Sequence, residues 1–263
     1  MIRALVTTLL GCLLATTGRA ESEIVTFPVT EFSGETTMLE AKLTVPQGEG
    51  PFPAVVLLHS CGGTDQEGTW ANYTRIASWG YVTLRIDSFG PRGIDHLCAP
   101  SPDIDRASYA TRARDAHAGR EFLASLPYVD GDRIAVVGWS HGGNSVMKAI
   151  SNISRYEPRT TTPFNAAVAF YPLCDLTRGL DAPLLILTGD ADNLTRAWNC
   201  ETMELPDATQ SFELVVYPGA THAFDWEGED VVYRGHKMSY DPEATADAYR
   251  RVEAFLAQHL QAP

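Results

Sequence analysis

The sequence predicts an α/β protein with one mainly parallel central sheet and helices on both of its faces. Strand signals and helix signals alternate along most of the chain, which is the order that parallel strands with crossover helices require. Residues 54–58 form a continuous apolar run, typical of a strand covered on both faces. The stretches that carry reactive side chains each follow a strand, and in such sheets ligands bind at the carboxyl ends of the strands.

An antiparallel hairpin at a sheet edge is expected first, because residues 24–32 and 36–45 alternate between apolar and polar side chains. The parallel part of the sheet follows, and no repeat, low-complexity tract or linker interrupts it. We therefore expect one domain after the N-terminal segment. The predicted strands lie at 54–58, 81–86, 134–137, 166–171, 184–187 and 212–217, and the predicted helices at 70–79, 108–126, 144–154 and 242–260.

Residues 1–20 are interpreted as an export leader. Arg3 supplies a positive start, an apolar run too short to cross a bilayer follows, and a small-x-small pattern ends at Ala20. We expect cleavage after Ala20 and a periplasmic or secreted domain of residues 21–263. A buried N-terminal helix is one alternative. A lipoprotein anchor at Cys12 is another, disfavoured because apolar sequence continues past the cysteine.

Composition limits the classes of partner. The 263 residues carry a formal net charge of -13, and 44% of them are hydrophobic, as in an ordinary globular protein with a sizeable core. The negative charge disfavours nucleic acid and anionic membrane surfaces as partners. It does not favour any one substrate, and the sequence leaves the oligomeric state open.

Export changes the interpretation of the cysteines. Cys61, Cys98, Cys174 and Cys200 would remain after cleavage, an even number in an oxidising compartment. Four cysteines allow three pairings. We expect Cys61–Cys98 and Cys174–Cys200, because each pair joins segments that follow strands at the same end of the sheet; free buried thiols are the alternative. The sequence has no C-x-x-C pair and no H-E-x-x-H motif, so we expect no metal and no cofactor.

The central motif is the G-W-S-H-G stretch at residues 138–142, where a buried strand turns sharply into a helix. Such a turn presents a serine away from its own backbone, beside a base and backbone N–H donors. Gly138 and Gly142 allow neighbouring chain to pass close by, and the helix that follows directs its positive end at the site. We predict Ser140 as a nucleophile. A tight turn that needs glycine only for packing is the alternative.

A serine nucleophile requires a base, and a carboxylate that fixes the tautomer of that base. His222 is the predicted base, because it lies in a loop that follows a strand. Asp190 and Asp192 both follow the strand at 184–187, and the order serine, aspartate, histidine suits either of them. Structural or solvated roles are expected for the other histidines, which are His59, His96, His117, His141, His236 and His259.

The chain resembles the dienelactone hydrolase family of α/β-hydrolases over essentially its whole length after the leader. The resemblance is carried by the segments His59–Gly63, Asp87–Gly93, Gly138–Gly143, Gly189–Asp192 and Thr221–Phe224. It implies an α/β-hydrolase domain. In that family the acid is the last residue of a G-x-x-D turn, which implies Asp192 rather than Asp190.

Negative charge on a substrate oxygen requires two backbone donors. One predicted donor is the N–H of His141, the residue after the nucleophile. The resemblance implies that the second is the N–H of Cys61, in a glycine-bearing turn. A Cys61–Cys98 bridge would stiffen this wall of the site.

The chain departs from the family pattern in two ways. Typical members have a cysteine nucleophile and a glutamate on the oxyanion turn, whereas this chain has Ser140 and Ser60, which looks like the plain esterase form of the site. Members that cleave dienelactone hold its carboxylate with two arginines. Arg92 is the candidate for the first, but the second position holds Asp225, which would repel a carboxylate.

We therefore expect a serine carboxylic-ester hydrolase that cleaves small esters or lactones, uncharged or cationic rather than anionic. Trp139, Phe224 and Trp226 are expected to line an apolar substrate pocket, and Tyr171 to be a core residue. A serine peptidase of the prolyl oligopeptidase type would use the same constellation. A non-catalytic ligand-binding protein on the same fold is the third interpretation.

Overall fold

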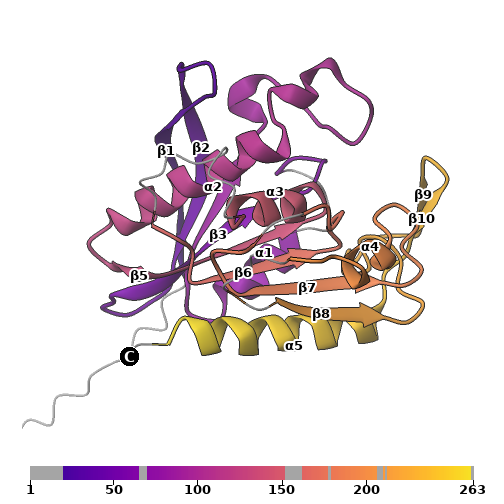
Figure 1. Cartoon of the computed structure of the whole chain (residues 1–263). Coiled ribbons are helices and arrows are strands. Elements are labelled where there is room, and N and C mark those ends of the chain that lie inside the picture. Colours follow the sequence, from indigo (N-terminus) through magenta and orange to yellow (C-terminus); the bar gives the residue numbers. More distant parts are fainter. Residues whose placement is uncertain are drawn as a thin grey trace, which may run out of the picture.

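A computed structural model describes residues 20–64, 70–151, 162–176, 179–205, 210 and 212–261. The predicted leader, except for Ala20, lies outside these residues. The N-terminal β-rich segment and the βα alternation form one eight-stranded sheet (Figure 1). Its strands are β1 (Glu21–Thr30), β2 (Thr36–Val45), β3 (Phe52–Leu58), β4 (Val82–Asp87), β5 (Val129–Trp139), β6 (Ala166–Phe170), β7 (Leu184–Gly189) and β8 (Phe212–Tyr217).

The order of the strands across the sheet is β1-β2-β4-β3-β5-β6-β7-β8. β1 and β2 form the predicted antiparallel hairpin, and β2 pairs antiparallel with β4. Every other neighbouring pair is parallel. The fold class predicted from the alternating pattern is therefore confirmed. Because β3 to β8 run parallel, their carboxyl ends all lie on the same side of the molecule.

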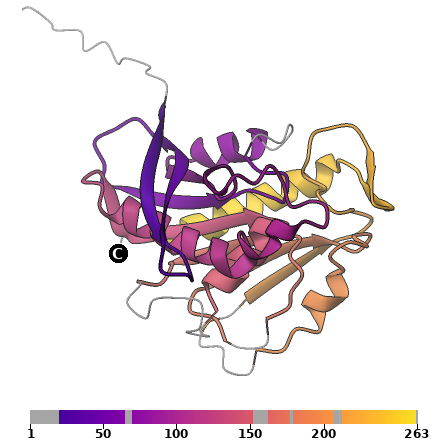
Figure 2. The ribbon, with the colours of Figure 1, turned by 90° about the horizontal axis from the view of Figure 1, so that it is seen from above.

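The described helices cover both faces of this sheet, and a small hairpin stands apart from it. The helices are α1 (Trp70–Ala77), α2 (Tyr109–Ala124), α3 (His141–Ala149), α4 (Ala197–Glu201) and α5 (Pro242–His259), with the 3-10 turns η1 (Gly90–Arg92) and η2 (Pro102–Asp105); the hairpin is β9 (Val231–Tyr233) and β10 (His236–Met238). In Figure 1, α5 runs below the sheet while α2 and α3 lie above it. Figure 2 shows α2 crossing over the strands when the molecule is seen from above.

Two separate cores result from the alternation of side chains along the strands. In β3, Val56 and Leu58 point to the core beneath α2 and α3. Val55 and Leu57 point to the opposite core, beneath α1 and α5. All four side chains are at most 1% exposed. The central strands are thus covered on both faces, as their continuous apolar sequence predicts.

Some features of the helices, and one pair of short strands, were not predicted from the sequence. α2 begins close to the expected position, and its inward side carries the buried polar residues Arg112, Asp115, His117 and Arg120 as well as the apolar Ala113, Ala116 and Leu123. α3 ends at Ala149, earlier than expected. α4 and the β9–β10 hairpin were not predicted.

The edge strands of the sheet are β1 and β8, and β1 shows polar residues to solvent along most of its length. Such an edge resists pairing with other chains.

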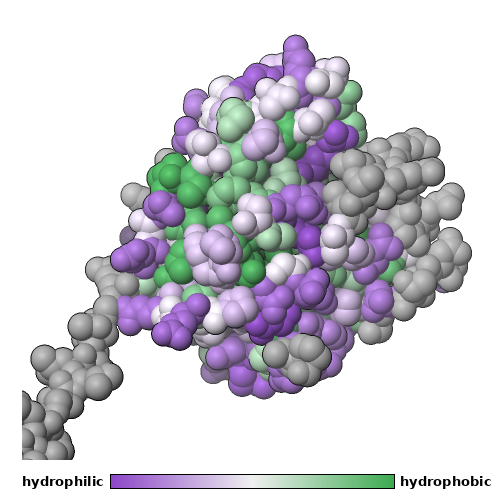
Figure 3. Space-filling view, turned by 90° about the vertical axis from the view of Figure 1, so that its left-hand side faces the viewer, coloured by the Kyte–Doolittle hydropathy of each residue, from purple (hydrophilic) through white to green (hydrophobic). Residues whose placement is uncertain are grey.

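Figure 3 views the molecule from the left-hand side of Figure 1, and apolar residues gather there among polar ones. Within the described ranges, no helix is both long and apolar enough to cross a membrane.

Candidate active site

Ser140 lies at the turn between β5 and α3, and its backbone is strained. Its φ of 52° and ψ of -112° are values that a residue with a side chain rarely adopts. The turn is also tight, because a Cβ on Gly138 would lie 2.4 Å from the carbonyl oxygen of Gly142, and a Cβ on Gly142 would lie 2.1 Å from that of Leu58. Both glycines are therefore required by close approach of the backbone, as predicted. The side chain of Ser140 remains partly exposed.

His222 reaches Ser140 from the loop after β8. Its Nε2 lies 2.9 Å from the Oγ of Ser140, and its Nδ1 lies 2.7 Å from Oδ2 of Asp192. The imidazole is 3% exposed, so its orientation is set by packing, including a ring contact with Tyr171 at 4.7 Å between centroids. The structure thus brings the three predicted side chains into one hydrogen-bonded series, although they are far apart in the sequence.

The carboxylate of Asp192 is held from several directions. Its Oδ1 accepts the backbone N–H groups of Leu194 and Thr195, each at 2.8 Å, and its Oδ2 accepts the hydroxyl of Thr195 at 2.7 Å. Burial alone would raise the pKa of Asp192, but the hydrogen bonds from His222 and Thr195 and the interaction with the imidazole outweigh it, so this pKa lies below its ordinary value. The carboxylate is therefore charged at neutral pH.

Asp190, the alternative acid, has a different role in the turn after β7. It is exposed, and its Oδ1 accepts the backbone N–H of Gly219 at 2.6 Å. This bond braces the loop that carries His222. Thr195 was not predicted as a site residue; besides Asp192, its hydroxyl bonds the carbonyl oxygen of Tyr171 at 3.0 Å. An aspartate side chain often bonds the backbone two residues further on, so the sequence signalled the turn after Asp192 but not the hydroxyl contact of Thr195.

The two backbone amides predicted as oxyanion donors belong to His141 and Cys61. His141 is the first residue of α3, so its N–H belongs to the free amino end of that helix. Cys61 follows β3 in a turn where Gly62 and Gly63 donate to Ser60. Within the described residues, the N–H of Cys61 has no hydrogen-bond acceptor. Cys61 lines the same cavity as Ser140, and His141 follows Ser140 directly in the chain.

Both predicted disulfides are present. Cys61–Cys98 ties the turn after β3 to the segment that follows η1, with 4.9 Å between the Cα atoms. Cys174–Cys200 ties the loop after β6 to α4, with the same Cα separation. The first bridge holds one wall of the candidate site, because both of its cysteines line the pocket described next.

A cavity of about 300 Å³ opens beside Ser140 and His222. The unpredicted β9–β10 hairpin, which follows the segment that carries His222, forms one of its walls. Aromatic and aliphatic side chains predominate in its lining. The residues that line it are Ser60, Cys61, Asn72, Cys98, Trp139, Ser140, Tyr171, Leu194, His222, Ala223, Asp225, Trp226, Val231, Val232, Tyr233 and Met238.

Of the three aromatic residues predicted to line the pocket, two lie at the cavity and one lies in the core. Trp139 and Trp226 line the cavity, as expected. Phe224 does not: it is 0% exposed and packs behind the cavity against Tyr171 and Tyr217, with ring centroids 5.8 and 5.2 Å apart. Tyr171, expected as core, is buried but also reaches the cavity wall.

Asp225 lies at the floor of this cavity and is 0% exposed. Four hydrogen-bond donors converge on its carboxylate: Tyr171 Oη at 2.7 Å, Tyr249 Oη at 2.8 Å, Trp139 Nε1 at 3.0 Å and Asn72 Nδ2 at 3.0 Å. Burial raises its pKa, and these hydrogen bonds oppose the rise without cancelling it. The position that holds an arginine in dienelactone-cleaving family members is therefore a buried acidic group that fixes the walls of the pocket.

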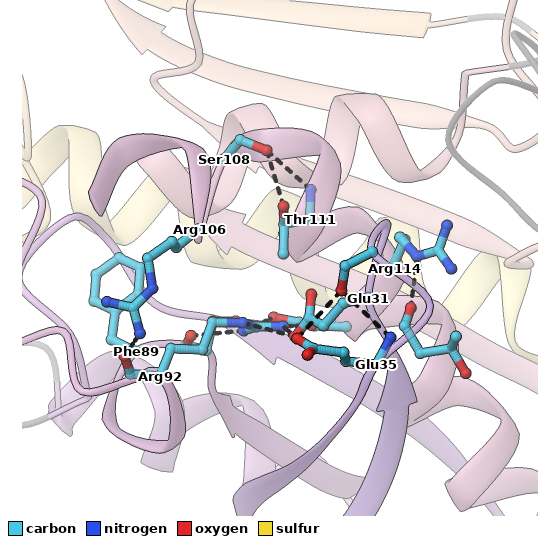
Figure 4. Close-up of polar contacts among 12 residues, drawn as sticks. Glu31, Glu35, Phe89, Arg92, Arg106, Ser108, Thr111 and Arg114 are labelled. Atoms are coloured by element: carbon cyan, nitrogen blue, oxygen red, sulfur yellow. Dashed lines mark hydrogen bonds and ion pairs between the residues drawn. The ribbon is translucent and has the colours of Figure 1, made fainter. Parts of the chain in front are cut away.

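Arg92 was expected to hold a substrate carboxylate, and the structure corrects this expectation. It is 7% exposed, donates to both carboxylate oxygens of Asp115 at 2.8 and 2.7 Å, and pairs with Glu31 at 2.8 Å. Figure 4 shows Arg92 directed toward Glu31, with Arg106 bonded to the backbone carbonyl of Arg92. Because two carboxylates already occupy its guanidinium, Arg92 clamps the β1–β2 hairpin to α2 and does not line the cavity.

Two of the other histidines, His59 and His117, are buried and have structural roles. His59 is buried beneath the oxyanion turn, where its Nδ1 bonds the carbonyl oxygen of Ser60 and its Nε2 accepts the N–H of Ser88. His117 is buried rather than solvated, and it bonds the carbonyl oxygen of Ala149 at the end of α3. Among the described residues, no group of three or more His, Cys, Asp or Glu side chains is arranged to hold a metal ion.

Comparison with known proteins places this geometry in a family. A model of the dienelactone hydrolase family matches residues 39–260. The chain is 26% identical over 192 residues to a probable dipeptidyl-aminopeptidase B of Grosmannia clavigera, a match that covers 60% of this chain and 19% of the relative. It is 33% identical over 111 residues to the esterase FrsA of Klebsiella pneumoniae, covering 40% and 23%. The aligned regions thus span about a fifth to a quarter of the length of these relatives.

Solved structures show the same fold. A putative dienelactone hydrolase from Klebsiella pneumoniae superposes with a TM-score of 0.66 at 23% identity, covering 90% of this chain and 99% of that one. A dienelactone hydrolase-like promiscuous phosphotriesterase from metagenomic libraries, P91, also gives 0.66, at 18% identity and 91% and 99% coverage. Since the family model matches most of the sequence, the chain belongs to the dienelactone hydrolase family and has its α/β-hydrolase fold.

Proposed function

We propose that this protein is a serine carboxylic-ester hydrolase that cleaves small uncharged esters or lactones through an acyl-enzyme on Ser140. The observation that carries the proposal is the series Ser140 Oγ, His222, Asp192, with contacts of 2.9 and 2.7 Å. A base within hydrogen-bond distance of the nucleophile, itself oriented by a buried carboxylate, is the arrangement that acyl transfer requires.

The proposed reaction has two steps. Oγ of Ser140 attacks the ester carbonyl carbon while Nε2 of His222 takes the hydroxyl proton; the tetrahedral intermediate then expels the alcohol, which receives that proton. A water molecule attacks the resulting acyl-serine by the same route in reverse and releases the acid. Asp192 holds the Nδ1 proton and stabilises the imidazolium, and the N–H groups of Cys61 and His141 donate to the oxyanion.

The charge and shape of the cavity support a small, uncharged acyl or alcohol group. Its described lining contains no lysine or arginine, and the acidic side chain in it is the buried Asp225. An anionic substrate would therefore enter the cavity without a compensating cation. Trp139, Trp226 and the β9–β10 hairpin offer apolar surface to an uncharged group.

The test is the hydrolysis of p-nitrophenyl acetate, p-nitrophenyl butyrate and a simple aryl lactone, compared with p-nitrophenyl succinate, which carries a free carboxylate. We expect turnover of the neutral compounds, a kcat/KM at least about tenfold lower for the anionic ester, and no turnover by Ser140→Ala. A folded wild-type protein without activity on any of these activated esters would contradict the proposal.

A serine peptidase is the second candidate, favoured by the similarity to a probable dipeptidyl-aminopeptidase B. The same three side chains can cleave an amide. The discriminating comparison is p-nitroacetanilide against p-nitrophenyl acetate, together with a dipeptidyl p-nitroanilide. The ester hydrolase proposal predicts measurable turnover of the ester alone.

We also propose that residues 1–20 direct export. The two disulfides are consistent with an oxidising compartment. Expression of the full sequence in a bacterium, followed by mass measurement of the protein from the periplasm, should give a chain that begins at Glu21. Uncleaved protein retained in the cytoplasm would contradict export.

A further inference from the structure

Arg112, on α2, is a fully buried cation behind the candidate active site. Its side chain is 0% exposed. One terminal nitrogen donates to Nδ1 of His141 at 2.7 Å, and the other donates to the backbone carbonyl oxygen of His59 at 2.6 Å. The guanidinium also lies over the ring of Phe89, 5.1 Å from its centroid. A single side chain therefore joins the segment after β3 to the first turn of α3.

These two segments are the ones that carry the proposed oxyanion donors. His59 is two residues before Cys61, and His141 itself supplies the other N–H. We propose that Arg112 is a positioning residue for the oxyanion hole: its planar guanidinium fixes the spacing of the two donor segments and places a buried positive charge behind the developing oxyanion. This inference rests on the proposed function and extends it to a residue outside the pocket.

The charge on Arg112 is not neutralised by a hydrogen-bonded carboxylate among the described residues. The carboxylate of Asp115, also on α2, is hydrogen-bonded to Arg92, and it acts on Arg112 through its charge without a hydrogen bond. The partners of Arg112 are instead a neutral ring and a carbonyl oxygen. Burial lowers the pKa of Arg112 to about 10, so the guanidinium remains charged at neutral pH. In a site of low dielectric, a fixed charge of this kind favours the anionic transition state over the neutral substrate.

The ring of His141 serves as a rigid link in this arrangement. Because Arg112 donates to Nδ1, the ring proton is on Nε2 and the ring is neutral. Burial, and then the positive charge of Arg112, lower the pKa of His141 to about 2. The ring of Tyr109 packs against it, with centroids 4.5 Å apart. The imidazole therefore transmits the position of α2 to the start of α3 without titrating.

The experiment compares Arg112→Gln and Arg112→Lys with Arg120→Gln as a matched control. Arg120 is also on α2, is 2% exposed and also bonds backbone carbonyls, those of Pro163 and Gly131, away from the pocket. For each variant we would measure kcat and KM with p-nitrophenyl acetate, the melting temperature, and the Kd of phenylboronic acid by calorimetry. The boronate forms a tetrahedral adduct with the serine and so reports on the oxyanion hole without turnover.

For Arg112→Gln we expect kcat to fall about 100-fold with KM within about threefold of wild type, and the Kd of the boronate to rise in parallel. Arg112→Lys keeps the charge but cannot bond both segments, and should lose about tenfold in kcat. Arg120→Gln should keep kcat within about twofold even where its melting temperature falls.

Three outcomes would overturn the role of Arg112. These are wild-type kcat in folded Arg112→Gln, wild-type kcat in Arg112→Lys, and losses in Arg120→Gln as large as those in Arg112→Gln. Should Arg112→Gln fail to fold, Arg112→Lys decides the question alone. A wild-type protein that neither hydrolyses the ester nor binds the boronate would instead refute the proposed function, and the role of Arg112 with it.

Discussion

Two carboxylates bond side chains that line the pocket and are buried almost equally, yet they are held by different kinds of partner. Asp192 is 3% exposed and Asp225 is 0% exposed. Asp192 bonds the imidazole of His222, a group that can take up a proton. Among the described residues, the side chains that donate to the carboxylate of Asp225 are neutral, namely Asn72, Trp139, Tyr171 and Tyr249.

The pKa values of the two groups accordingly shift in opposite directions. Burial acts to raise both. For Asp192, the hydrogen bonds and charge interaction with His222, with help from Thr195, more than compensate, and its pKa falls below the ordinary value. For Asp225, burial prevails and its pKa rises. The comparison teaches that burial alone does not set the direction of a carboxyl pKa shift; the partners of the carboxylate decide it.

The largest expected effect separates the two carboxylates by activity. Asp192→Asn should lower kcat by about 10⁴-fold, because the imidazole can no longer keep its proton on Nδ1 and its Nε2 no longer accepts from Ser140. Asp225→Asn should lower kcat by no more than about tenfold, through looser pocket walls. Steady-state kinetics on p-nitrophenyl acetate would measure both, and losses of equal size would remove the distinction between the two groups.

A smaller effect is expected when each carboxylate loses one hydroxyl partner. Thr195→Val removes a bond to Asp192 and should lower kcat about tenfold. Tyr249→Phe removes a bond to Asp225 and should lower the free energy of unfolding by about 2 kcal/mol, as for a hydrogen bond to a charged group, with kcat within about twofold. Urea denaturation and kinetics on both variants provide the check. The opposite assignment of effects would show that Asp225, not Asp192, supports the chemistry.

The smallest effect is in the pH dependence of stability, where the two groups should act with opposite signs. The folded pKa of Asp192 lies below the ordinary value of 3.8, so its contribution is present above that pH and is lost as the pH falls through the folded pKa. The folded pKa of Asp225 lies above 3.8, so its contribution is present below that pH and is lost as the pH rises through the folded pKa.

Free energies of unfolding between about pH 3 and pH 7 would measure this difference, with the unfolded-state pKa taken as about 3.8 for both groups. Asp192→Asn should remove part of the loss of stability on the acid side. Asp225→Asn should remove part of the loss as the pH rises. If both variants changed the profile in the same direction, the contrast between the two environments would be wrong.

Most of the sheet and the three central side chains were predictable, since they depend on local patterns. Apolar runs such as 54–58 and the glycines around Ser140 are properties of a few neighbouring residues. The order of the residues along the chain did not distinguish Asp190 from Asp192. It required the family pattern, and the structure explains it, because Asp190 is exposed toward Gly219 while Asp192 points to His222.

The errors came from residues whose partners are distant in the sequence. Arg92 lies in a motif segment near the site, but its carboxylate partner Glu31 is 61 residues away, and proximity along the chain does not reveal which way a long side chain points. The buried face of α2 was missed for the same reason: Arg112 is stabilised by His59 and His141, not by apolar periodicity.

The sequence of the β9–β10 hairpin contains a turn signal that would have predicted it. A run of β-branched and aromatic residues, 231–233, is followed by Arg234 and Gly235, which both adopt positive φ. Two residues of positive φ between short strands are typical of a tight hairpin turn, and the glycine pointed to it. Recognising it would have added one wall of the pocket to the predicted site.

The most direct test of the central claim is to trap the acyl-enzyme. The protein would be mixed with excess p-nitrophenyl butyrate, quenched in acid within milliseconds to seconds, digested and examined by mass spectrometry. The account predicts a butyryl adduct on the peptide that contains Ser140, and none in Ser140→Ala. Rapid release of p-nitrophenol with an adduct on another residue, or turnover that persists in Ser140→Ala, would contradict it.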